Sequence, residues 1–147
     1  MDPNKKRKTW MSLLAKADPR LLADRFEAYG QPPDYEWLRA PEIGGAMVRG
    51  RMGGTGAPFN LGEMTVTRCS LRLVTGQVGH AYVQGRDRTK ATQAALVDAM
   101  MQGADEKAVR EAILTPLQEA RDLARATRAA KAAATRVDFF TMVRGED

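Results

Sequence analysis

Residues 62–84 read GEMTVTRCSLRLVTGQVGHAYVQ and contain two runs in which apolar and polar side chains alternate. This period of two is typical of strands that bury one face. Thr75-Gly76 separates the runs and predicts a tight turn between strands at 62–74 and 77–84. The stretch therefore predicts an antiparallel hairpin.

The longer of these predicted strands changes phase along its length. Val66 is out of register with Leu71, which predicts a bulge or bend near Thr67-Arg68. Arg68 and Arg72 share one face of the strand if no bulge falls between them. A row of arginines on a sheet can bind a polyanion or form salt bridges with a partner subunit, and both interpretations stay open.

Glycine marks the region around this hairpin. Ten of the 13 glycines fall between Gly44 and Gly85, a density that disfavours helix. Further alternation predicts strands at 35–39 and 45–52. We expect residues 35–84 to form an antiparallel β-sheet.

Helical periodicity flanks this β region on both sides, so the predicted fold class is α+β in a single domain of 147 residues. Residues 9–30 predict a helical hairpin in which Asp18-Pro19 starts the second helix and Gly30 ends it. Residues 87–137 form the predicted C-terminal helical region, with helices at 87–102 and 105–114 and a long alanine-rich helix from Pro116 to about Val137. Residues 138–147 are expected to form a docking tail.

Charge and composition exclude several classes of protein. The net charge is +5, but Lys5 to Lys8 supply four of these charges within an expected disordered leader at residues 1–8, so nucleic-acid binding is not favoured. One cysteine, Cys69, and one histidine, His80, cannot assemble an intramolecular disulfide or a zinc cage, and no metal site is assigned. Metal binding by carboxylates stays open. No apolar run is long enough to span a membrane, and no secretory signal is evident. A soluble, cytoplasmic protein is expected.

A glycine-rich loop is the most conspicuous chemical feature. Arg49 and Arg51 precede Gly53, Gly54, Thr55 and Gly56, and backbone N–H groups in such a loop can surround a phosphate or phosphonate that the arginines clamp. The loop lacks the Gly-Lys-Ser/Thr ending of a P-loop. From the pattern alone, an ordinary wide connection that uses glycine for positive φ is the favoured explanation.

A second candidate anion site lies between the last predicted strand and the following helix. Arg86 and Arg88 flank Asp87 there, and a helix N-terminus favours an anionic ligand. Alternatively, Asp87 caps the helix and the arginines are solvated.

Side chains capable of nucleophilic or acid-base catalysis are sparse. His80 and Cys69 both alternate with apolar residues, so a structural histidine and a small core thiol are favoured. No serine, cysteine or lysine stands beside an evident base. No catalytic residue is assigned.

The C-terminal segment is apolar and needs burial. Phe139, Phe140, Met142 and Val143 are costly to expose to water, so they are candidate partner-interface residues. Docking onto the N-terminal helices is the alternative.

Several long segments of the chain, taken in order, resemble the PhnG family, the G subunit of the bacterial phosphonate carbon-phosphorus lyase system. The resemblance extends from Trp10 to Gly145. The segments that carry it are WMSLLA at 10–15, DYEWLRA at 34–40, RMGGTGAPF at 51–59, GEMTVTR at 62–68, YVQGRD at 82–87 and RVDFFTMVRG at 136–145.

This resemblance implies a non-autonomous subunit acting in phosphonate catabolism. It implies a core complex with H, I and J type subunits and an L type accessory protein. Together with H, I and L, the G subunit is required to replace the adenine of MgATP with a phosphonate, giving alpha-D-ribose 1-methylphosphonate 5-triphosphate. MgATP is then a co-substrate of the complex, and no cofactor is expected on this chain alone. The alternatives are a small stand-alone enzyme that binds a phosphorylated ligand and, less favoured, a basic RNA-binding protein.

Overall fold

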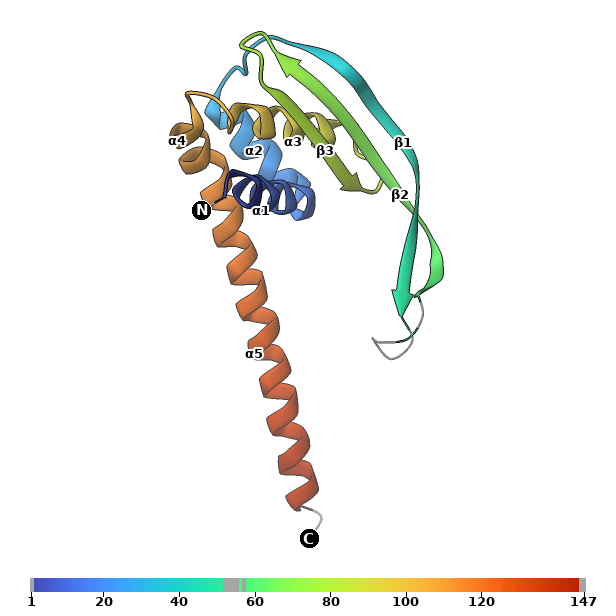
Figure 1. Ribbon diagram of the computed structural model, residues 1–147. Helices are drawn as coiled ribbons and strands as arrows, with labels where there is room; N and C mark the ends of the chain where they lie inside the picture. Colours follow the sequence, from blue (N-terminus) through green and yellow to red (C-terminus); the bar gives the residue numbers. More distant parts are fainter. Residues whose placement is uncertain (1, 52–55, 57, 146–147) are drawn as a thin grey trace.

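The fold is α+β, as predicted, with helices gathered on one side of a three-stranded antiparallel sheet (Figure 1). The computed structural model describes residues 2–51, 56 and 58–145, and the side chains of 2–47, 56 and 62–136. The elements, in order, are α1 (Pro3–Lys16), α2 (Pro19–Tyr29), β1 (Tyr35–Arg51), β2 (Pro58–Leu73), β3 (Val78–Gln84), α3 (Arg88–Met100), α4 (Glu106–Val109), the π-helical segment η2 (Arg110–Leu114) and α5 (Thr115–Gly145).

The predicted hairpin is confirmed by β2 and β3. Residues 66–72 of β2 pair without interruption with residues 84–78 of β3. The turn closes through a bond from the Leu73 N–H to the Gln77 carbonyl at 2.8 Å, and Gly76 has a φ of +104° that L side chains rarely adopt. The turn chemistry in the sequence thus sets the register of β2 against β3.

The predicted position of the bulge is wrong. Two register shifts add residues to β1, between Trp37 and Arg39 and between Arg39 and Glu42. A third shift, between Val48 and Arg49, adds a residue to β2 instead. The pairing of β2 with β3 runs unbroken through Thr67-Arg68. Pro41 lies within the second shift, and proline has no N–H to donate to a ladder, so the edge strand absorbs the irregularity. For the same reason the strands predicted at 35–39 and 45–52 are one long strand, interrupted only in register.

A single apolar core lies between the sheet and the helices. The alternating β2 residues Leu71 and Leu73 and the β3 residue Val83 pack against α3, whose exposed surface is small, and against α1. Gly79 of β3 sits where an added Cβ would collide with the Ala95 carbonyl oxygen, so glycine is what lets β3 approach α3 so closely. The buried set of α3 is Lys90, Ala91, Ala94, Ala95, Leu96, Val97, Asp98, Ala99 and Met100.

The C-terminal helices form one nearly continuous run. The predicted break before Pro116 is replaced by η2, in which the Thr115 N–H reaches the Arg110 carbonyl. This widened turn fits the chain around Pro116, which has no N–H to donate. The predicted end near Val137 is also wrong, because no glycine or proline follows Pro116 until Gly145, and α5 continues to that residue.

The chain starts with helix rather than with the expected disordered leader. Asp2 caps α1 by accepting the Asn4 N–H at 3.0 Å, and Pro3 occupies the first helical position, where proline is favoured. Asp18 caps α2 in the same way, as predicted. The basic run at residues 5–8 therefore lies on an ordered helix.

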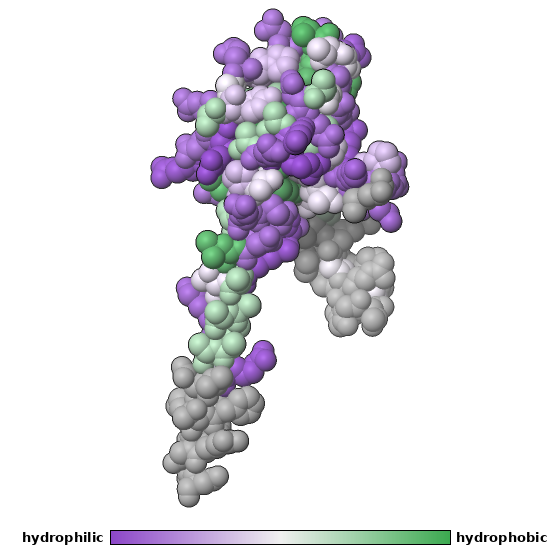
Figure 2. All heavy atoms as spheres, turned by 90° about the vertical axis from the view of Figure 1, so that its left-hand side faces the viewer, coloured by the Kyte–Doolittle hydropathy of each residue, from purple (hydrophilic) through white to green (hydrophobic). Residues whose placement is uncertain are grey.

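Two arms project from this packed body (Figure 1). The ribbon arm consists of residues 45–51 and 58–65, where β1 and β2 pair with each other and β3 pairs with neither. The helical arm consists of residues 118–136 of α5, none of which is buried, although Leu117 just before it is. Figure 2 shows this arm leaving a largely hydrophilic body with hydrophobic residues along its exposed side.

Candidate functional site

The turn after β3 is built to start α3. Gly85 leaves the strand with a φ of +91°, and the Thr67 hydroxyl donates to the Gly85 carbonyl at 2.7 Å while accepting the Asp87 N–H at 3.1 Å. Asp87 then accepts the Lys90 N–H at 2.9 Å. The capping alternative for Asp87 is confirmed, and its carboxylate occupies the helix end at which an external anion was considered.

Arg86 and Arg88, on either side of this cap, are exposed. Within residues 62–136, neither guanidinium has an ion-pair partner. Their charges are therefore available to a ligand or a partner surface.

The glycine-rich loop lies mostly outside the described residues. The backbones of Arg49 and Arg51 belong to the end of β1, and Gly56 forms a bend, whereas Gly53, Gly54 and Thr55 are not described. Gly44 lies opposite Val66, which in turn pairs with Gln84. Arg49 is five strand residues further along, about 16 Å at the usual strand rise. The two predicted anion sites are thus separate places along the sheet.

Arg68 and Arg72 lie on one face of β2, as the unbroken pairing with β3 requires. Each faces a glutamate of β1: Arg68 approaches Glu42 at 3.9 Å and Arg72 approaches Glu36 at 3.5 Å. Both pairs are solvent-exposed and contribute at most about 1 kcal/mol each. The two arginines thus face glutamates of the neighbouring strand within the chain, and both interpretations of the row stay open.

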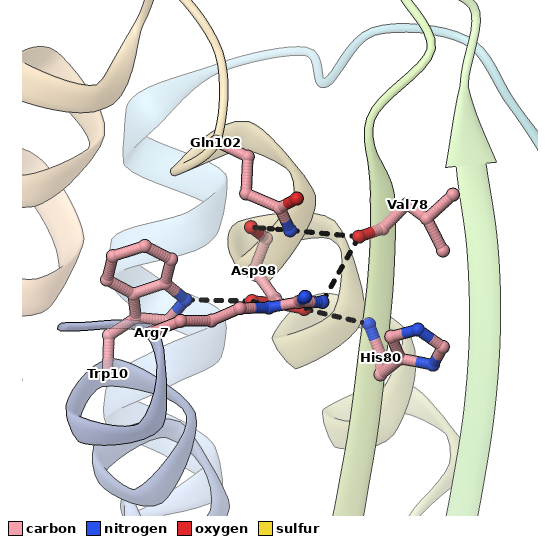
Figure 3. A network of polar contacts seen from close by, with 6 residues as sticks. All are labelled: Arg7, Trp10, Val78, His80, Asp98 and Gln102. Atoms are coloured by element: carbon pink, nitrogen blue, oxygen red, sulfur yellow. Dashed lines mark hydrogen bonds and ion pairs between the residues drawn. The ribbon is translucent and has the colours of Figure 1, made fainter. Parts of the chain in front are cut away.

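A buried carboxylate that the sequence analysis missed ties α1, β3 and α3 together (Figure 3). Asp98 has a relative exposure of 0%. It accepts bonds from Arg7 at 2.9 and 3.2 Å, from the Trp10 indole N–H at 2.8 Å and from the His80 backbone N–H at 2.9 Å. A lone aspartate among the apolar residues of α3 was the available signal.

The same network gives Arg7 a structural role, although the sequence analysis had assigned it to a disordered basic leader. Its guanidinium also donates to the Val78 carbonyl at 3.3 Å, beside Gln102, which donates to the same oxygen at 2.9 Å. Donation to Asp98 raises the pKa of Arg7. The His80 imidazole points away from the carboxylate in Figure 3 and is exposed, so the Asp98 contact is to the His80 backbone alone.

The two remaining chemically interesting side chains are also committed to packing. Cys69 is buried, donates its thiol to the Ala91 carbonyl at 3.3 Å and has its pKa raised to about 11 by burial, which keeps it from acting as a thiolate. Lys90 is buried and donates to the Ala15 carbonyl at 2.9 Å, at the C-terminal end of α1. Burial lowers the pKa of Lys90, and the carboxylates of Asp87 and Asp18 oppose that effect.

A groove runs between the start of α5 and the junction of α1 with α2. Its volume is about 940 Å³, roughly twice that of the other hollows in the described part of the chain. Apolar side chains from all three helices, including Leu13, Leu21 and Leu117, form its floor. Its rim is basic, with Lys16, Arg121, Arg125 and Arg128.

The described residues contain no group of three or more histidine, cysteine, aspartate or glutamate side chains arranged to hold a metal ion. No helix among them is long and apolar enough to cross a membrane.

Comparison with known proteins accounts for nearly the whole chain. The model of the family described as phosphonate metabolism protein PhnG matches residues 5–145. The chain belongs to the PhnG family. A curated relative, the alpha-D-ribose 1-methylphosphonate 5-triphosphate synthase subunit PhnG of Rhizobium meliloti (strain 1021), is 46% identical over 141 residues. The alignment covers 96% of this chain and 90% of the relative.

The PhnG family match reaches further towards the N-terminus than the resemblance between Trp10 and Gly145. It begins at residue 5 and so includes Arg7. This agrees with the structure, in which Arg7 and Trp10 bind the same buried carboxylate from successive turns of α1. The basic N-terminal residues therefore belong to the PhnG fold.

Proposed function

We propose that this chain is a non-autonomous subunit of alpha-D-ribose 1-methylphosphonate 5-triphosphate synthase, acting in the catabolism of organic phosphonates. The observation that carries the proposal is the similarity to the Rhizobium synthase subunit over nearly the whole of both chains. The proposed reaction of the assembled enzyme is displacement of adenine from MgATP by a phosphonate. A phosphonate oxygen bonds to the anomeric carbon of the ribose, the bond from that carbon to adenine breaks, and adenine leaves.

The described side chains support a subunit that does not catalyse alone. The Cys69 thiol is buried and protonated at neutral pH, and the Asp98 carboxylate already accepts bonds from three residues. His80 is exposed on the sheet, and no carboxylate among the described residues orients its ring. A role in holding partners and substrates in place accounts for a subunit of this kind, since positioning supplies much of the rate of a two-substrate reaction.

The proposed partners are the H, I and J type subunits of a core complex, together with an L type accessory protein. MgATP is the proposed co-substrate of that complex. Both arms of the chain support assembly with partner subunits. No residue of the helical arm is buried, and the two strands of the ribbon arm pair only with each other.

Arginines are the proposed contribution of this chain to substrate binding. Arg86 and Arg88 flank the start of α3 with no ion-pair partner in the described part of the chain, and Arg49 and Arg51 stand before the glycine-rich loop. Arginines aimed at phosphate oxygens would hold the triphosphate or the phosphonate. Replacing Arg49 and Arg51 with alanine in the assembled complex should raise the KM for MgATP or phosphonate at least tenfold. Full activity of that double variant would remove the phosphate clamp from the proposal.

Reconstitution tests the proposed function itself. Adenine release from MgATP and methylphosphonate is measured with this chain alone, with the partner subunits alone and with the two combined. We expect adenine only from the combination. Turnover by the chain alone would support the stand-alone enzyme, and undiminished turnover by the partners alone would contradict a required subunit.

A further inference from the structure

The groove beside α5 is lined by apolar side chains that are partly open to solvent. Its floor is apolar, formed by residues such as Leu13, Leu21 and Leu117 from three helices. Leu117 is buried, but six residues later Leu123 is 69% exposed on the same wall. The apolar surface of the groove therefore extends along the helical arm, where the packed body no longer covers it and solvent reaches it.

Charge is distributed unevenly around this groove. Lys16, Arg121, Arg125 and Arg128 line it, and Asp18 is the one carboxylate among its described lining residues. Asp18 is occupied in part by capping α2. The groove wall of α5 is therefore strongly cationic.

The opposite side of α5 carries the acidic residues of the arm. Glu119 and Asp122 do not line the groove, and Asp122 accepts a bond from Gln118 at 2.9 Å. The uneven division of charge around α5 marks the groove side as the recognition side.

The spacing of the arginines favours an elongated occupant. Arg121, Arg125 and Arg128 are four and three residues apart and so follow one side of the helix over about 10 Å at the usual rise. In a site for a single phosphate group the arginines would converge on one point, whereas these three are spread along the helix. It matches carboxylates repeated at helical spacing on a rod lying alongside, with apolar side chains between them on the groove floor.

We propose that this groove receives an acidic amphipathic helix from another subunit of the synthase, which rests on the proposed function. The complementary charge argues against the same face of a second copy, because two copies meeting there would oppose arginine to arginine. The partner helix presents small or apolar residues to Leu117 and Ala124 and carboxylates to Arg125 and Arg128. It covers the exposed Leu123 at the same time.

Charge reversal with a matched control tests the electrostatic half of this inference. Arg125→Glu plus Arg128→Glu changes the groove by four charge units, and Arg20→Glu plus Arg136→Glu makes the same change at exposed positions that do not line it. We expect the groove variant to weaken assembly with the co-expressed subunits at least tenfold and the control to weaken it less than twofold. Equal effects of the two variants would overturn the inference, as would a raised KM for MgATP with assembly unchanged, which would mark a nucleotide site. Circular dichroism and thermal melting verify that both variants are folded.

Photo-crosslinking identifies the occupant. A photoreactive phenylalanine replaces Ala124 in the groove or, as the control, Ala129 on the outer side of the arm, and the crosslinked peptides of the assembled complex are sequenced. We expect Ala124, and not Ala129, to crosslink to a helical segment of a partner with an excess of Asp and Glu. Crosslinks to a second copy of this chain, to a basic segment or to nothing would overturn the inference. If the wild-type chain joins no partner at all, the proposed function fails; if it joins normally and only these variants behave unexpectedly, the groove assignment alone fails.

Discussion

The packed body and the two arms differ in what stabilises them. In the body, α3 buries almost every residue against β2, β3 and α1, and the Asp98 network joins β3 and α3 to α1, which is far from both in sequence. The helical arm buries no side chain, and the ribbon arm has only its own two strands. Isolated helices and two-stranded ribbons are marginal in water. From this difference we expect the body to fold by itself and the arms to gain their stability from contacts with partner subunits.

The largest effect should follow from removing Asp98. Asp98→Ala leaves the Trp10 indole N–H and the His80 N–H without their acceptor and removes the partner of Arg7. We expect a loss of about 2–6 kcal/mol in the free energy of unfolding, because two N–H groups lose their acceptor at about 1–3 kcal/mol each, while the partly exposed Arg7 can turn to solvent. Urea denaturation measures it. The control, Asp122→Ala on the helical arm, should stay within about 0.5 kcal/mol of wild type, and equal losses would erase the distinction between body and arm.

Two leucines on one helix give the most closely matched comparison. Leu117 has 3% exposure and Leu123 has 69%, although both belong to α5. Leu117→Ala should cost about 2–5 kcal/mol in the isolated chain, because it empties space in the core. Leu123→Ala should be nearly neutral in the isolated chain and should weaken assembly instead. A large loss of unfolding free energy from Leu123→Ala alone would show that the arm folds against the body.

Gly79 tests how closely the body is packed. An added Cβ at Gly79 meets the Ala95 carbonyl oxygen, a backbone atom that cannot move aside cheaply, whereas at Gly44 no atom lies within 4 Å. We expect Gly79→Ala to lower the free energy of unfolding by about 1–3 kcal/mol, the usual cost of overpacking. Gly44→Ala serves as the control, and thermal melting distinguishes the two. Similar melting temperatures would mean that β3 and α3 are further apart than the structure has them.

The smallest effect is the pH response of Cys69. Burial raises the pKa of its thiol to about 11, above the value of about 8.5 expected when unfolded. Because the raised group favours the protonated folded state, its contribution to stability is fully present below the unfolded pKa and is lost as pH rises to about 11. At pH 8 the folded chain should therefore react with iodoacetamide far more slowly than the urea-unfolded chain. Equal rates would place Cys69 at the surface.

The sequence predicted the body well where a structural feature depends only on residues that are close together in the chain. The alternation in 62–84, the turn at Gly76 and the caps at Asp18 and Asp87 all act within a few residues, and each is found as predicted. The misplaced bulge shows the limit, because the register shifts depend on how β1 pairs with β2, with Pro41 inside one of them, and not on the phase of β2 alone.

Contacts between distant segments could not be predicted in this way. Arg7 and Asp98 are 91 residues apart, so neither periodicity nor charge count could reveal that a residue of the expected leader completes a buried network. The function of the chain was predicted from its resemblance to the PhnG family over long segments, because no catalytic residue could be assigned from the sequence. The candidate phosphate-binding residues were proposed from local motifs and remain a prediction; Arg86 and Arg88 are exposed, which suits contact with either a ligand or solvent.

Hydrogen exchange of the chain alone and in the assembled synthase tests the division between body and arms most directly. We predict that the amides of α3 are strongly protected in both states, whereas those of residues 118–136, 45–51 and 58–65 gain protection of at least tenfold only on assembly. Arm amides as protected in the isolated chain as those of α3, or unchanged by assembly, would contradict the account.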